Sequence, residues 1–296
     1  MQCSSPSGPP SMPRCAPRFA SLPSPFALAF AFTLAFVAGC ASAPKLHEYK
    51  GAIHVHSRFS HDSEGTYEEI LTAAKRVGLD FVIMTDHPPS GDPGLSLREG
   101  WRGLHEGVLF IQGAEHSDQV LALGIDEPLR ATTRQGKIDE IHAQGGLAFI
   151  AHGEEVERWD FGRFDGMEIF NLHVALKLRQ DNPAFWVRAL SMAAEDPDAL
   201  WDLFAEPQEV LLERWRLLNA ERPVVGIGGN DAHQNTYGLD PYWRSLGFVN
   251  TWVRAPELTR DAVLDALREG RSWVTAGVGT RLRWDSLPTG GAMPTP

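Results

Sequence analysis

Histidines and carboxylates recur at the ends of apolar stretches along this sequence, and their types and spacing could do chemistry. In chain order they are His54, His56, His61, Asp62, Asp86, His87, Glu115, His116, His152, Asp231 and His233. Imidazole and carboxylate groups are ligands for zinc, manganese and iron, and they also act as general acids and bases. No Cys follows Cys40, so any metal beyond that residue must be held by nitrogen and oxygen.

The apolar stretches that precede these residues predict strands, and helical patterns lie between several of them. The expected strands are 51–56, 80–84, 108–112, 120–125, 147–150, 167–170, 224–227, 246–253 and 273–275. The expected helices are one opened by a capping box at Thr66–Glu69, then 134–143, 183–194, 207–220 and 259–268. This alternation predicts an α/β fold with parallel strands, and about seven such units favour a barrel over an open sheet.

The C-terminal ends of parallel barrel strands meet at one mouth, which is where the polar residues of the series would gather. His54 and His56 are two apart on a predicted strand, so both side chains should leave the same face. A single buried His is more often a hydrogen-bonded core residue than a ligand. Several strand ends that deliver such groups to one mouth predict a metal centre, because unpaired polar groups there would be costly.

The order of these motifs resembles that of the PHP (polymerase and histidinol phosphatase) superfamily. The motifs are His-x-His with Ser-His-Asp, Thr-Asp-His, Gly-x-Glu, Ala-His-Gly and Asp-x-His, between His54 and His233. The resemblance implies a distorted (β/α)7 TIM-like barrel of PHP type over residues 51–280. It also implies a cluster of two or three divalent metal ions, Mn, Zn or Fe. The stretch 267–273 is similar to the end of the subgroup that includes the CehA/McbA-like metallohydrolases.

Carried onto matching positions, the resemblance implies a set of metal ligands and catalytic residues. The ligands would be His54, His56, His87, Glu115 as a bridge, His152, Asp231 and His233. The first motif contributes one more, either His61 or Asp62. The superfamily usually has another His where this chain has Gln119, so a third metal is absent or weak, or His116 replaces that ligand. We expect Asp86, Glu115 and His233 to serve catalysis, with Asp86 orienting a ligand or, alternatively, capping a turn.

The N-terminus predicts export. Arg14 and Arg18 precede an apolar run at 26–37, and the residues up to Cys40 resemble the lipobox of a bacterial lipoprotein. We predict a lipoprotein-type signal peptide at 1–39, a tether at 40–50 and a loose tail at 281–296. The protein would then face the periplasm, anchored in the cell envelope by lipid on Cys40. The alternatives are an uncleaved anchor or a misassigned start codon before a cytosolic enzyme.

The excess of acidic over basic residues indicates which binding partners to expect. There are 27 Lys and Arg against 38 Asp and Glu, with a net charge of −11 and no basic run, so we expect no nucleic-acid partner. The expected activity is hydrolysis of a small-molecule phosphate ester. The alternatives are hydrolysis of a carboxylic ester, amide or carbamate, or a metal-binding lipoprotein without turnover. The amidohydrolase superfamily fits less well, because it needs a carbamylated Lys and none lies near 148–152.

Two further groups lie close to the motifs. Glu168 and Asn171 lie at another strand end, and His173 follows two residues after Asn171. Structural packing is the expected role of all three, and the alternative for Glu168 and Asn171 is that they line the pocket. Tyr242 and Trp243 lie in a polar loop and could rim an apolar substrate.

Overall fold

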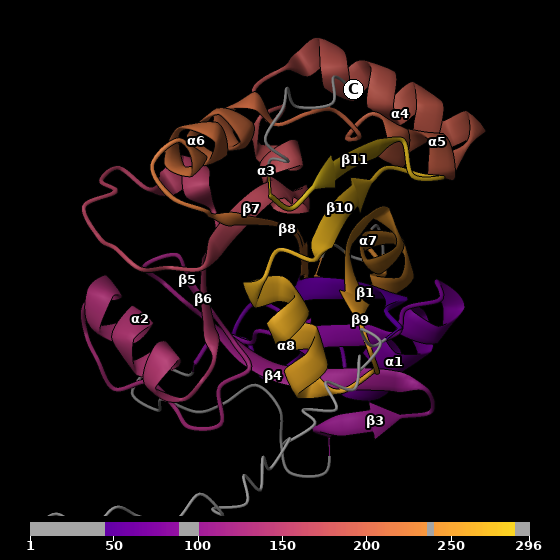
Figure 1. Cartoon of the computed structure of the whole chain (residues 1–296). Coiled ribbons are helices and arrows are strands. Elements are labelled where there is room, and N and C mark those ends of the chain that lie inside the picture. Colours follow the sequence, from indigo (N-terminus) through magenta and orange to yellow (C-terminus); the bar gives the residue numbers. More distant parts are fainter. Residues whose placement is uncertain (1–44, 89–100, 236–239, 288–296) are drawn as a thin grey trace, which may run out of the picture. The chain divides into compact units, whose positions relative to one another are not determined.

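The computed structural model describes residues 45–88, 101–235 and 240–287 (Figure 1). The predicted signal peptide, Cys40, the first part of the predicted tether and the end of the predicted tail lie outside these residues. No helix within the described ranges is both long enough and apolar enough to cross a bilayer.

Seven strands form a closed ring. In ring order they are β1 (His47–Val55), β2 (Phe81–Met84), β4 (Val108–His116), β5 (Val120–Leu123), β6 (Leu147–Ile150), β7 (Gly166–Asn171) and β8 (Val225–Ala232). Pairing of β8 with β1 closes the ring, with Ile53 opposite Gly229 and Val55 opposite Ala232. The prediction of a seven-stranded barrel is therefore confirmed.

One strand of the ring runs against the predicted direction. β5 is antiparallel to both β4 and β6, whereas the other pairs of the ring are parallel. Residues 117–119 connect β4 to β5 in a tight turn, in which Gln119 has a φ of 63° and its N–H donates to His116 O at 3.0 Å. So short a connection cannot make the crossover that parallel pairing needs. The prediction of all-parallel strands is wrong at β5 for this reason.

Further strands extend the sheet beyond the ring. β9 (Val249–Ala255) pairs antiparallel with the start of β1, and β10 (Ser272–Ala276) and β11 (Leu282–Asp285) follow it. β3 (Gly103–His105) pairs with β4. The barrel domain thus begins inside the predicted tether, because residues 47–51 pair with 251–255, and β11 occupies part of the predicted tail. The predicted strand 246–253 is wrong in its first half, where helix α7 ends.

The helices follow the sequence patterns closely where they are long. They are α1 (Tyr67–Arg76), α2 (Arg134–Ala143), α3 (Leu172–Lys177), α4 (Pro183–Glu195), α5 (Pro197–Asp202), α6 (Glu209–Asn219), α7 (Tyr242–Phe248) and α8 (Arg260–Arg268). The capping box is present at α1, where Glu69 N donates to Thr66 Oγ1 at 3.2 Å and Thr66 N donates to Glu69 Oε2 at 2.8 Å. Figure 1 shows α4 and α5 together, on the side of α3 and the β10–β11 hairpin.

An apolar cluster supports the residues of the predicted metal centre. Its members come from six strands of the ring, with α8 packed against them, and include Ile53, Ile83, Ile111, Leu121, Phe149, Ile227, Val263 and Leu267. On β1, β2, β4, β6 and β8 the polar residues follow these apolar positions within a few residues, at the end of the strand or just past it. Packing of the apolar positions therefore fixes where the polar strand ends lie.

Candidate metal centre

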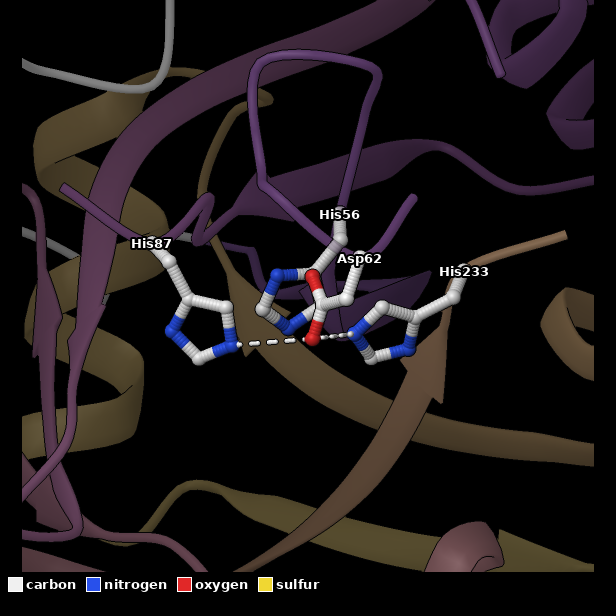
Figure 2. Close-up of side chains that lie close together, drawn as sticks. All are labelled: His56, Asp62, His87 and His233. Carbon is white, nitrogen blue, oxygen red and sulfur yellow. Dashed lines mark ion pairs between the residues drawn. The ribbon is translucent and has the colours of Figure 1, made fainter. Parts of the chain in front are cut away.

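The structure gathers eight of the predicted residues into two groups of four. The His56 cluster consists of His56, Asp62, His87 and His233 (Figure 2), and the His54 cluster consists of His54, Glu115, His152 and Asp231. Within each cluster one nitrogen or oxygen atom per residue lies within 4.8 Å of the others. Their role as ligands stays a prediction, but the convergence that the sequence predicts is present.

In the His56 cluster one carboxylate lies between two imidazoles. Asp62 Oδ2 is 3.4 Å from His87 Nε2 and 3.4 Å from His233 Nε2 (Figure 2). The ring of His56 stacks on that of His233 with 4.1 Å between centroids. His56 Nε2 is buried and has no well-directed hydrogen bond, although Glu115 Oε2 lies 3.2 Å away. A buried nitrogen without a directed partner is the observation expected of a side chain placed to bind an ion.

In the His54 cluster two carboxylates face two imidazoles. His54 Nε2 lies 2.9 Å from Glu115 Oε2 and 3.4 Å from Asp231 Oδ1. His152 Nε2 lies 3.3 Å from Glu115 Oε1 and 3.4 Å from Asp231 Oδ2. The side chains of the two carboxylates are almost fully buried, which a protein tolerates only where positive charge balances them.

The same two carboxylates also contact the His56 cluster. Glu115 Oε2 lies 3.5 Å from His87 Nε2, and Asp231 Oδ1 lies 3.4 Å from His233 Nδ1. Glu115 therefore lies between the clusters, which is the position that the resemblance implies for a bridging ligand.

The backbone is strained where it delivers the His54 cluster. His54, His152 and Asp231 have φ values of 69°, 46° and 48°, in the left-handed region that costs free energy for residues other than Gly. At His54 the register of β1 with both neighbouring strands shifts between Ile53 and Val55. Such a bulge re-aims side chains at a strand end, so the convergence of His54 and His56 does not follow from simple alternation.

Glu168, for which packing is the sequence expectation, orients His54. The fully buried Glu168 has Oε1 2.6 Å from His54 Nδ1. Its Oε2 accepts from Asn171 Nδ2 at 2.8 Å and from the backbone N of His152 at 3.2 Å. A carboxylate behind an imidazole fixes the tautomer and presents the other ring nitrogen to the cluster. The available signal in the sequence is a charged residue among the apolar residues of strand β7, which ends at the polar Asn171.

Asp86 orients His56 in a similar way, through a hydroxyl. Asp86 accepts from the N and Oγ of Ser57 and from Ser60 Oγ at 3.2 Å. Ser60 Oγ in turn lies 2.9 Å from His56 Nδ1 and accepts from His87 N at 2.9 Å. Asp86 is buried behind the cluster and does not line the cavity at the mouth, so its contacts fit the orienting alternative.

The structure distinguishes Asp62 from His61. The side chain of His61 is 78% exposed and belongs to neither cluster, whereas Asp62 joins the His56 cluster. His116 also lies outside both clusters, although it lines the same cavity and its buried Nε2 has no hydrogen-bond partner. Gln119 Oε1 accepts from Arg134 Nη2 at 2.8 Å, which directs its amide toward α2.

Two predictions on the neighbouring residues need correction. The packing expected of His173 is wrong, because His173 is exposed at the cavity, whereas Asn171 is buried and hydrogen-bonded behind the His54 cluster as expected. Tyr242 and Trp243 do not line the cavity at the mouth, and Tyr242 is almost fully buried. Its hydroxyl donates to His56 O at 2.6 Å, so Tyr242 supports the strand end that carries His56.

Close packing of imidazoles and carboxylates changes their proton affinities. Burial lowers the pKa of His54, but Glu115 and other carboxylates outweigh it and raise the pKa well above its usual value. Against burial, a hydrogen bond to Glu115 raises the pKa of His152 to about 9. Burial and the nearby His233 lower the pKa of His56 to about 3. Protons on His54 and His152 thus supply positive charge that bound cations would otherwise provide.

The two clusters line a cavity of about 270 Å³ at the mouth of the barrel. The cavity adds His116, Ser117, Gln119, Glu155 and His173 to residues of both clusters. Imidazole nitrogens and carboxylate oxygens without thiolate are the donor set of Zn, Mn and Fe sites. The residues present therefore fit divalent metal ions.

Comparison with solved structures identifies the class of fold. One similar structure is a two-domain protein from Bacteroides vulgatus ATCC 8482 that contains a predicted PHP-like metal-dependent phosphoesterase. Its sequence is 18% identical to this chain, with a TM-score of 0.54, and the match covers 78% of this chain and 66% of that one. A lesion-specific endonuclease from Pyrococcus furiosus is 15% identical with a TM-score of 0.44, over 75% of this chain and 56% of that one. No protein-family model and no curated protein matches the sequence.

The first of these likenesses shows the fold. The chain has the distorted TIM-like barrel of PHP-like proteins, and it spans just under two thirds of the Bacteroides protein. Two clusters of histidines and carboxylates lie at the mouth of this barrel.

Proposed function

We propose that this chain is a metal-dependent hydrolase of the PHP superfamily, and that its reaction is hydrolysis of a phosphate ester. The observation that carries the proposal is the pair of clusters that meet at Glu115 and line one cavity. Two neighbouring sites at the mouth of a barrel are the arrangement that two-metal hydrolysis uses.

The residues of the chain would divide the work as follows. The His56 and His54 clusters would each hold a divalent ion, and Glu115 would bridge them. When bound, such ions lower the pKa of water and polarise a phosphoryl oxygen. Glu168 and Asp86 keep the imidazoles of the two clusters in position through the hydrogen bonds already described. These contacts preorganise the site, so little reorganisation is needed during the reaction.

His116 would contact the substrate or a water molecule at the cavity wall. Burial, together with Lys137, lowers the pKa of His116 to about 4, so its ring is neutral at pH 7. A neutral imidazole with a buried, unpartnered Nε2 can either donate or accept one hydrogen bond there, depending on the tautomer.

The test is turnover of p-nitrophenyl phosphate by the chelated protein before and after reloading with Mn²⁺, Zn²⁺ or Fe²⁺. We expect turnover only after reloading, and a loss of at least roughly 100-fold in Glu115→Gln. His61→Ala, which alters an exposed residue beside the His56 cluster, should keep full activity. Turnover of p-nitrophenyl acetate or an aryl carbamate in place of the phosphate would assign the site to carboxyl-type esters. A metal-loaded protein inactive on all three would support a binding lipoprotein instead.

We also propose export and lipid attachment at Cys40, which the lipobox-like residues up to Cys40 support. Palmitate labelling of the protein in a bacterial host should be lost in Cys40→Ser. Equal labelling of Cys15→Ser and the unchanged protein would serve as the matched control. Unlabelled wild-type protein in the cytosolic fraction would contradict the proposal.

A further inference from the structure

A second cavity adjoins the metal-site cavity. It has a volume of about 420 Å³ and shares Asp62, His173, Asp231 and His233 with the first cavity. A molecule whose reacting group lies at the clusters can therefore extend into this second space. The volume lies within the range of small-molecule sites, roughly 300–1,000 Å³.

Apolar and aromatic side chains form the wall away from the clusters. Leu172 and Leu176 come from α3, Trp186 from α4 and Trp201 from α5. Leu176 is 39% exposed and Trp186 is half-buried, so both present apolar surface that folding leaves uncovered. Trp186 Nε1 donates to Gln180 O at 3.2 Å, which fixes the position of the indole. Helices α3, α4 and α5 belong to the segment between β7 and β8 (Figure 1). This segment thus supplies an aromatic wall beside the metal-site cavity.

The charges of the lining do not favour a second anionic group. Among the described residues that line this cavity, Lys177 is the one Lys or Arg. Its ammonium group forms ion pairs with Glu155 and, at 3.5 Å, with Glu154. Asp62 and Asp231 lie at the end shared with the metal site. The ammonium group of Lys177 would therefore not be free to pair with an anion placed against the aromatic wall.

We propose that this cavity, the aryl pocket, binds the uncharged aromatic leaving group of the ester. The inference rests on the proposed function and names its substrate class as aryl phosphate monoesters. An aromatic ring stacked on Trp186 gains burial of apolar area and ring–ring contact. In the reaction the oxygen of water bonds to phosphorus and the ester P–O bond breaks. The electrons of that bond and a proton from the water go to the aryl alcohol, and phosphate is released.

The test is a binding measurement that does not depend on turnover. Phenylphosphonate and methylphosphonate cannot be hydrolysed, and they differ only in the group that would enter the aryl pocket. Calorimetric titration of the metal-loaded full chain should give roughly tenfold tighter binding of phenylphosphonate. Trp186→Ala should reduce this preference to about twofold or less, with methylphosphonate affinity nearly unchanged.

Two further variants separate pocket effects from folding effects. Leu176→Ala truncates a partly exposed side chain of the same wall and should reduce the preference by several-fold. Trp243→Ala is the matched control, because Trp243 is half-buried under the guanidinium of Arg76 and does not line the aryl pocket. It should leave the preference unchanged.

Equal affinity for the two phosphonates, failure of both to bind, or an unchanged preference in both wall variants would overturn the inference. Failure of the proposed function has a different signature. In that case phenylphosphonate would bind selectively to the metal-loaded protein, yet no phosphate ester would be hydrolysed.

Discussion

Replacing Glu168 with Gln changes one atom of a buried side chain and should weaken metal binding at the His54 cluster. The carboxylate of Glu168 accepts from three donors: His54 Nδ1 at 2.6 Å, Asn171 Nδ2 at 2.8 Å and His152 N at 3.2 Å. A carboxylate suits this role because both oxygens are acceptors. With a hydrogen on His54 Nδ1, Nε2 presents its lone pair to the cluster.

A Gln side chain cannot satisfy the same three donors. If its oxygen faces His54, its NH₂ group meets the donors of Asn171 and His152. If its NH₂ group faces His54, the hydrogen of the imidazole must move to Nε2, the atom 2.9 Å from Glu115 Oε2. Either arrangement opposes a ligand role for His54. Partners of this kind are worth roughly 10- to 100-fold in metal affinity, or about 1.4–2.7 kcal/mol.

The assay is competition for Zn²⁺ or Mn²⁺ against a chromophoric chelator, with melting curves to show that the variant folds. Glu106→Gln is the charge-matched control, because Glu106 forms an exposed ion pair with Lys75 away from both clusters. It should bind metal as the unchanged protein does. A folded Glu168→Gln protein whose affinity stays within about twofold of that control would refute the tautomer argument.

Three further predictions follow from the same geometry. Asp62→Asn should lower the bound metal by one equivalent in elemental analysis, whereas His61→Ala should not, since only Asp62 lies in a cluster; equal effects would contradict this. The metal-free protein should lose stability, on the order of 3 kcal/mol, as the pH rises from 6.5 to about 9. The reason is that His152 in the folded protein has its pKa raised to about 9 and keeps a proton that the unfolded chain releases above pH 6.5. Melting in chelator should show this loss, and metal-loaded protein should not follow it, because ligand histidines must be deprotonated; parallel pH curves would contradict the metal assignment. Asp86→Asn should reduce metal affinity less than Glu168→Gln, because Asp86 acts on His56 through Ser60; a larger loss would show that Asp86 contacts the metal itself.

The residues that meet at the mouth can be predicted from the sequence, because each motif directly follows an apolar strand. His87 follows β2, His152 follows β6, and Glu115 and Asp231 lie near the ends of β4 and β8. Parallel strands bring their C-terminal ends together whatever the details of the connections. The helix ends at 134 and 143 are equally predictable, since local capping and turn residues set them.

The remaining features depend on contacts between distant parts of the chain. The direction of β5 is reversed by a tight turn at Gln119. The positive φ of this turn falls on a Gln and not on a Gly, so the sequence does not mark the turn. β11 exists because residues 282–285 pair with β10, and a four-residue run has little pattern of its own. Tyr242 is buried because its hydroxyl meets His56 O, a contact that spans 186 residues. Glu168 is unusual as a charged residue in a buried strand, but the sequence does not show that it contacts His54.

The central claim is that the two clusters hold metal ions that together support hydrolysis. The most direct measurement is the initial rate of p-nitrophenyl phosphate hydrolysis by chelated protein against the equivalents of metal added. The structure predicts that turnover rises to a plateau at two equivalents, one for each cluster. It also predicts that Glu115→Gln, which alters the carboxylate between the clusters, removes most of that rise. Folded protein that binds two equivalents of metal without turnover of this or a carboxyl ester would contradict the claim, as would turnover that persists in excess chelator.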